Sequence, residues 1–196
     1  MDTKQFRREL HRYPELSFEE HRTAAFIAEQ LTALGIENRP IATTGVLARI
    51  EGKRGNLKRC VVLRADIDAL PIKELNDIAF CSKNEGVMHA CGHDMHTAIL
   101  FGVLQELNKE RNFEGTLFGI FQPGEELNPG GASIVLQEKP FEGYDVAAVI
   151  GQHVDARFEV GEVAISLNGD LPKENYRNPL NSSEQFQKSF EQCFNQ

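Results

Sequence analysis

Residues 60–68 read Cys60-Val61-Val62-Leu63-Arg64-Ala65-Asp66-Ile67-Asp68, a short apolar run that leads directly into acidic side chains. An apolar run of this length is typical of a strand buried in a sheet. Further along the chain, similar runs alternate with helical patterns, which indicates an α/β sandwich. The elements predicted after the quoted stretch are a helix over 96–109, a strand over 116–121, a short helix over 132–137 and a strand over 146–150.

Two helices are predicted before this stretch. The first ends before Pro14, and the second ends at Gly35. Ser17 stands three residues before Glu20, which is the spacing of a capping box. We therefore expect the second helix to begin there, with these two side chains bonded to its free amides.

A β-hairpin is predicted between the second helix and the quoted stretch. A β-type run over 46–50 precedes the run over 60–63, and the residues between them, 52–58, are rich in Gly, Asn and Lys. Two β-type runs joined by a turn-rich segment indicate antiparallel neighbours.

Composition and charge narrow the class of protein. The chain has 196 residues, with 21 Lys and Arg against 29 Asp and Glu, and a formal net charge of -8. This acidic balance argues against a nucleic-acid partner, because such binding depends on clustered Lys and Arg. No apolar stretch approaches the roughly 20 residues of a membrane span, and the charged start lacks the apolar core of a secretory signal. The four cysteines are scattered, so we expect a reducing cytoplasm.

Chemically active residues gather in four clusters, each where a predicted strand ends or a helix begins. In open α/β sheets, ligands bind outside the carboxyl ends of the strands, so clusters that follow three strands can converge in one crevice. The sequence therefore predicts one composite site. Its clusters are residues 64–68, 89–96, 122–126 and 151–153.

Cys91 and His93 are candidate metal ligands. Their spacing of two directs both side chains to the same side of an extended segment or loop, and Gly92 between them gives the backbone freedom. A thiolate and an imidazole suit zinc and similar divalent ions, and Glu126 and His153 can complete a mixed sulfur, nitrogen and oxygen shell.

The neighbouring acidic residues suit supporting roles. A divalent cation lowers the pKa of a bound water to about 7, but a carboxylate outside the metal shell must still take the proton. One of Glu125 and Glu126 can hold a metal while the other faces that water. A Cys91 thiolate can bridge two ions about 3.5 to 4 Å apart, and Asp68 can accept the outer N–H of a ligating histidine.

Other interpretations stay open at this point. Cys91 could be the nucleophile of a cysteine hydrolase, with His93 or His153 as its base. Asp66 could cap a turn at the end of its strand. His11 lies on a charged helix, where we expect its ring to be solvated.

The motifs resemble the M20 metallopeptidase family, specifically its aminoacylase and amidohydrolase branch. That branch includes hippurate hydrolases, auxin-conjugate hydrolases and N-acetyldiaminopimelate deacetylases. The order and spacing of several motifs carry the resemblance, which is more specific than one short pattern. The matching stretches are residues 8–11, 14–16, 64–72, 89–96, 122–126 and 130–132.

The resemblance implies a three-layer α/β/α zinc-exopeptidase-like catalytic domain with a mixed sheet, of which this chain is the amino-terminal portion. It implies hydrolysis of the amide of N-acyl amino acids or similar small conjugates by a metal-activated water, and a homo-oligomer is a further expectation. Two divalent ions are implied, as zinc, manganese, cobalt or nickel. The resemblance makes Glu125 the general base and acid and Asp68 the acidic residue that supports the metal site, with Cys91, His93, Glu126 and His153 as ligands.

The resemblance covers about residues 4–168. Family members continue into a lid or dimerisation domain and then supply a further histidine ligand, so we expect residues 1–168 to be the amino-terminal part of the catalytic domain and the second metal site to be incomplete. Residues 169–196 are expected to form an atypical polar tail with an apolar stripe. The alternative hypothesis is an inactive truncated remnant that binds metal weakly without turnover. The stripe consists of Phe186, Phe190 and Phe194.

Overall fold

A mixed sheet of five strands lies at the centre of the part of the chain that carries the motifs. The computed structural model describes residues 1–159, 162–163 and 178–179, and the chain divides into two units, residues 1–153 and residues 154–196. The elements of the first unit are α1 (Thr3–Arg12), α2 (His21–Ala33), β1 (Glu37–Ile41), β2 (Gly45–Glu51), β3 (Arg59–Asp66), α3 (His93–Glu110), β4 (Thr116–Gln122), α4 (Gly131–Gln137) and β5 (Asp145–Gly151).

The strands of this sheet lie in the order β1-β2-β4-β3-β5. β3 runs parallel to both β4 and β5, while β2 pairs with β1 and β4 in the antiparallel sense. The three parallel strands therefore end at one edge of the sheet. β1 was not predicted, because Ile41 is its one buried residue and Pro40 interrupts a β-type pattern. An edge strand tolerates that proline.

The predicted hairpin between residues 46–50 and 60–63 is wrong, because β4 lies between β2 and β3. Residues 52–58 pass around the start of β4, where the amide of Gly52 donates to the carbonyl oxygen of Gly115 at 2.9 Å. β2 and β3 are two strand spacings apart, roughly 10 Å. A link of this length spans that distance as easily as it forms a turn.

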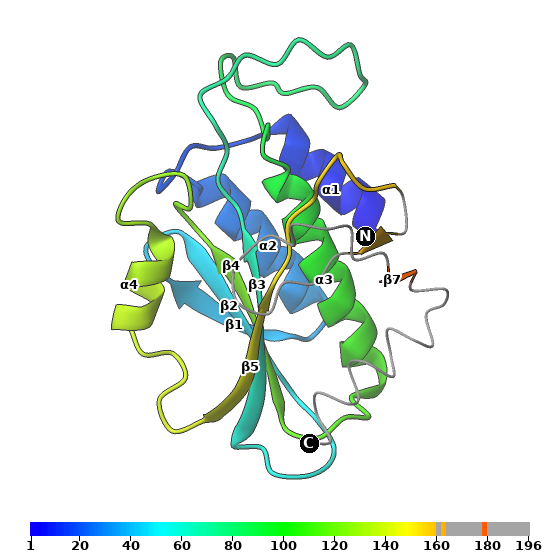
Figure 1. Ribbon diagram of the computed structural model, residues 1–196, viewed down its shortest axis with the longest axis vertical. Coiled ribbons are helices and arrows are strands. Elements are labelled where there is room, and N and C mark those ends of the chain that lie inside the picture. Colours follow the sequence, from blue (N-terminus) through cyan, green and yellow to red (C-terminus); the bar gives the residue numbers. More distant parts are fainter. Residues whose placement is uncertain (160–161, 164–177, 180–196) are drawn as a thin grey trace. The chain divides into compact units, whose positions relative to one another are not determined.

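Helices cover both faces of the sheet, as Figure 1 shows, with α1, α2 and α3 on one face and α4 on the other. Phe6 of α1 and Phe101 of α3 stack with ring centroids 4.1 Å apart. On the other face, Val135 of α4 belongs to a buried cluster that also contains Val62 and Phe118. The three-layer α/β/α arrangement is thus confirmed.

α2 begins without the predicted capping box. Its first residue follows Glu20, and neither Ser17 nor Glu20 bonds to the first-turn amides. Glu15 does so instead, because its carboxylate accepts from the amides of Arg22 at 3.1 Å and Thr23 at 2.7 Å. Ser17 and Glu20 are thereby available for contacts with distant parts of the chain.

One further side chain differs from expectation. His11 was expected to be solvated, but its ring is buried because Nδ1 lies 2.8 Å from Asp94 and Nε2 lies 3.1 Å from Glu74. No local pattern on α1 shows these partners, which lie on α3 and on the loop before it.

The second unit contains β6 (Glu162–Val163) and β7 (Asn178–Pro179), which pair in the antiparallel sense. Apart from β7, the predicted tail over 169–196 lies outside the described residues, and so do its three phenylalanines. Across the described ranges, no helix combines the length and the apolar composition needed to cross a membrane.

Candidate metal centre

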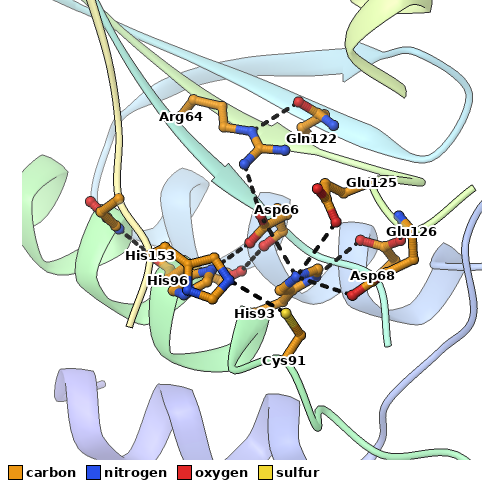
Figure 2. A network of polar contacts seen from close by, with 12 residues as sticks. Arg64, Asp66, Asp68, Cys91, His93, His96, Gln122, Glu125, Glu126 and His153 are labelled. Atoms are coloured by element: carbon orange, nitrogen blue, oxygen red, sulfur yellow. Dashed lines mark hydrogen bonds and ion pairs between the residues drawn. The ribbon is translucent and has the colours of Figure 1, made fainter. Parts of the chain in front are cut away.

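The site lies where the three parallel strands end. β3 ends at Asp66, β4 ends at Gln122, and β5 ends at Gly151. β3 is the middle one of the three, so the residues that follow each strand converge beside it, as the apolar runs predicted. Figure 2 shows side chains from these segments turned toward one another.

The first turn of α3 brings two histidines to the same place. Gly92 precedes the helix with φ of 85°, a left-handed conformation that glycine adopts without steric cost. The helix then begins at His93 rather than near 96 as predicted, so His93 and His96 stand three residues apart on one face. Both rings are buried, at 1% and 0% exposure.

His93 has one satisfied and one unsatisfied ring nitrogen. Its Nδ1 lies 3.1 Å from Asp68, whereas its buried Nε2 has no hydrogen-bond partner. Carboxylate oxygens of Asp66, Glu126 and Glu125 surround that Nε2 at 3.7, 3.7 and 3.9 Å. An orphaned buried nitrogen among three carboxylates is costly for the protein alone. The same arrangement suits a divalent cation.

Electrostatics around His93 agree with this geometry. Burial favours the neutral ring, but the hydrogen bond with Asp68 and the negative charges of Asp66 and Glu125 outweigh it and raise the pKa of His93. The surroundings thus favour a positive charge at the position that a metal ion would take.

Cys91 and His153 close one side of the site. Cys91, His93 and Glu126 each offer a ligand atom, and these atoms all lie within 4.8 Å of one another. The Nε2 atom of His153 lies 3.4 Å from Cys91 Sγ, and its ring centroid is 4.6 Å from that of His96. The structure therefore brings all four predicted ligands together, while their role as ligands stays a prediction.

The Cys91 thiol is held in its protonated form in the protein without metal. Burial, followed by the charge of Glu126, raises the pKa of Cys91 to about 11. A metal ion would have to displace this proton, because the thiolate is the form that binds metals.

Asp66 and His96 lie in the clusters of the predicted site, but neither was predicted as a metal ligand or catalytic residue. Asp66 Oδ1 lies 2.6 Å from His96 Nδ1, and Asp66 Oδ2 accepts from Arg64 at 2.7 Å. Asp66, His93 and His96 form a second group whose ligand atoms lie within 4.8 Å. A capping role for Asp66 does not account for these contacts. The spacing of three residues between His93 and His96 was the sequence signal that could have identified His96 as a site residue.

Asp68 links the candidate metal ligands to other parts of the chain through hydrogen bonds. Its Oδ1 faces His93, while its Oδ2 accepts from Ser17 Oγ at 2.7 Å and from the amide of Glu126 at 3.0 Å. Burial acts to raise the pKa of Asp68, but the hydrogen bonds from His93, Glu126 and Ser17 together lower it to about 2. The carboxylate is therefore charged at neutral pH.

Glu125 is the most accessible acid of the site, with a side chain 41% exposed, against 25% for Glu126. It follows the turn that leaves β4, next to Gly124. Its Oε2 approaches His93 without forming a hydrogen bond. A carboxylate placed at the open side of a cation site can exchange protons with a water or a substrate there.

Known proteins are similar to this chain in sequence. An N-acyl-L-amino acid amidohydrolase of Geobacillus stearothermophilus is 45% identical over 166 residues, which are 84% of this chain and 44% of that protein. An N-acetyldiaminopimelate deacetylase of Exiguobacterium sibiricum is 41% identical over 162 residues, which are 82% of this chain and 43% of that protein. The chain thus spans less than half the length of these relatives.

A solved structure and a family model point to the same family as these relatives. The YXEP protein of Bacillus subtilis, described as a dinuclear metal-binding peptidase from the M20 family, superposes with a TM-score of 0.78 and is 41% identical, with 84% of this chain and 45% of that chain covered. The model of peptidase family M20/M25/M40 matches residues 62–193. That match begins in β3 and includes all four candidate metal ligands and the acids around them, whereas Ser17, which donates to Asp68, lies before it. The chain therefore belongs to peptidase family M20/M25/M40.

Proposed function

We propose that this chain contributes to a metal-dependent amidohydrolase that cleaves the amide of N-acyl amino acids or similar small conjugates. The observation that carries the proposal is the buried His93 Nε2, which faces three carboxylates beside a thiol. The names of the amidohydrolase and deacetylase relatives support the substrate class.

The donor set fits divalent metal ions. Cys91, His93, Glu126 and His153 would hold them, and the Cys91 thiolate would supply an anionic donor. When bound, such ions would polarise the scissile carbonyl and make a nearby water more acidic. Sulfur, nitrogen and oxygen donors suit zinc, cobalt, nickel and manganese.

The chain's own groups then divide the remaining work. Asp68 accepts the Nδ1–H of His93, which keeps the Nε2 lone pair directed into the site. Glu125 takes the proton of the attacking water at its carboxylate and delivers it to the leaving amide nitrogen. The high pKa of Cys91, about 11, argues against its acting as a thiolate nucleophile in the metal-free protein.

The domain extent, oligomeric state, location and substrate type of this protein are also proposals. We infer that residues 1–168 are the amino-terminal part of the catalytic domain, that a homo-oligomer forms, and that the protein works in the cytoplasm, where Cys91 stays reduced. The substrate is a small molecule rather than a nucleic acid, in keeping with the net charge of -8. The competing function is a remnant that binds metal weakly without turnover.

The test is metal content and hydrolysis measured together. The purified chain should bind divalent metal and release amino acid from N-acetyl amino acids, and chelation should abolish both until metal is added back. Metal binding without turnover would support the remnant, and turnover that is unchanged after chelation would refute the metal mechanism. Adding the carboxy-terminal half of the Geobacillus relative as a separate chain tests whether activity requires the part of that relative which this chain does not match.

A further inference from the structure

Glu20 is a fully buried carboxylate at the start of α2, far in sequence from the metal candidates. Its Oε1 accepts a hydrogen bond from the amide of Gly124 at 2.8 Å, across 104 residues of sequence. Its Oε2 accepts from the hydroxyl of Thr44. A buried acid is tolerated when its oxygens are satisfied, and here one of the two donors belongs to the turn that precedes Glu125.

That turn is pressed against the segment that contains Glu20. Gly124 has φ of 57°, and a Cβ at this position would lie 2.3 Å from Phe18 Cζ. The carbonyl oxygen of Gly124 accepts from the amide of Gly131 at 3.0 Å, which ties the turn to the start of α4. The main chain before Glu125 is therefore fixed by a carboxylate, an aromatic ring and a helix start.

A second buried carboxylate holds the main chain after Glu125. The amide of Glu126 donates to Asp68 at 3.0 Å, and Asp68 in turn accepts from Ser17 Oγ at 2.7 Å. The amides of Gly124 and Glu126, on either side of Glu125, thus both donate to buried carboxylates. One of these is Glu20, and the other, Asp68, accepts from Ser17 in the same segment.

We propose that Glu20 is a positioning residue for the Glu125–Glu126 pair. It acts through the Gly124 amide, and together with Asp68 it fixes the backbone that aims one carboxylate at the substrate side and the other at the metal. The consequence for metal binding rests on the proposed function, whereas the consequence for the turn does not.

The same segment supplies a matched control. Glu15, like Glu20, accepts backbone hydrogen bonds, but its donors are the amides of Arg22 and Thr23 in α2. Glu15→Ala should weaken the helix start, and Glu20→Ala should loosen the turn. Glu20→Gln is the conservative variant, because its amide oxygen can still accept from Gly124 while its amide nitrogen donates to Thr44.

The first experiment needs no metal. Amide hydrogen exchange measured by NMR on the full chain should show that Glu20→Ala lowers the protection of the Gly124 amide at least tenfold, with a smaller loss at Glu126. Glu20→Gln should restore most of it, and Glu15→Ala should lower protection at Thr23 instead. Unchanged protection at Gly124 in Glu20→Ala would overturn the proposal. If that variant does not fold, Thr44→Val removes the other donor with little change of shape and should give a smaller loss in the same direction.

The second experiment uses Co²⁺ as the probe. Competition titration, followed by the visible absorption of the bound ion, should show at least tenfold weaker binding in Glu20→Ala and recovery to within about threefold in Glu20→Gln. Glu15→Ala should stay within threefold of the unmodified chain even if its Tm falls equally. Equal weakening by Glu15→Ala and Glu20→Ala would contradict the positioning role. If the unmodified chain binds no Co²⁺, the proposed function fails, and the exchange data still decide whether Glu20 holds the turn.

Discussion

His93 Nδ1 lies 3.1 Å from Asp68 Oδ1, so the ring is anchored on the side opposite its orphaned Nε2. Replacing Asp68 by Asn removes the charge that fixes this tautomer. Loss of such a partner costs roughly 10–100-fold in metal affinity, and we expect that loss for Asp68→Asn in a zinc competition titration. Asp77→Ala, which removes an exposed acid of the loop before α3, should leave the affinity unchanged. Equal affinity of Asp68→Asn and the unmodified chain would count against the role of Asp68.

Glu125→Gln should separate metal binding from turnover. The side chain keeps its size and lies outside the proposed ligand shell, so the metal content should stay as it is. Loss of a general base lowers rates by roughly 10²–10⁴-fold, and we expect kcat to fall in that range with N-acetyl amino acids. Metal analysis of the same sample is the control, and retained turnover would exclude Glu125 as the base.

Gly124→Ala should destabilise the chain more than a substitution at another left-handed glycine. Gly35 has φ of 68° with open space around it, whereas a Cβ on Gly124 meets Phe18. Gly35→Ala should cost about 1 kcal/mol for backbone strain alone, and Gly124→Ala about 1–3 kcal/mol more for overpacking. Urea unfolding of both variants measures the difference. Adding Phe18→Ala to Gly124→Ala should recover part of it, and no recovery would show that the ring is not the obstacle.

His11 should make the stability depend on pH. The hydrogen bond to Asp94 raises the pKa of His11 above its usual 6.5, despite the opposing effect of burial. The charged ring therefore adds to the free energy of unfolding fully below pH 6.5, and this contribution is lost as pH rises through the raised pKa. Urea unfolding across this range should show a steeper decline for the unmodified chain than for His11→Gln. His21→Gln removes an exposed histidine and should follow the unmodified chain, so identical slopes for all three would be the contrary result.

The main features of the fold could be predicted because they are local. The apolar run before Asp66 marks an inner strand of the sheet, and the helices and strands after it were found at nearly their true bounds. The order of the strands could not be predicted from local sequence, because residues 52–58 could form a hairpin turn or connect two strands that are not neighbours. Pairing with β4 decided between the two.

Long-range partners also explain what was missed at the site. Ser17 and Glu20 match a capping box in spacing, but Ser17 donates to Asp68 and Glu20 accepts from the Gly124 amide. Glu15 caps the helix instead. A pattern of hydrogen-bonding residues shows which groups need partners, and it does not show which partners the fold supplies.

Many of the contacts that assemble this centre join distant parts of the chain. Gly124 meets Glu20 across 104 residues, Cys91 meets His153 across 62, and Glu126 meets Asp68 across 58. Such contacts can form only after long loops have closed, which makes them late events in folding. An ion bound there would bind the native state and not its partly folded precursors, so metal should stabilise the whole sheet by mass action. The rise of a Co²⁺ absorption band during refolding would then report the step at which the turn at Gly124 reaches its native position beside Glu20.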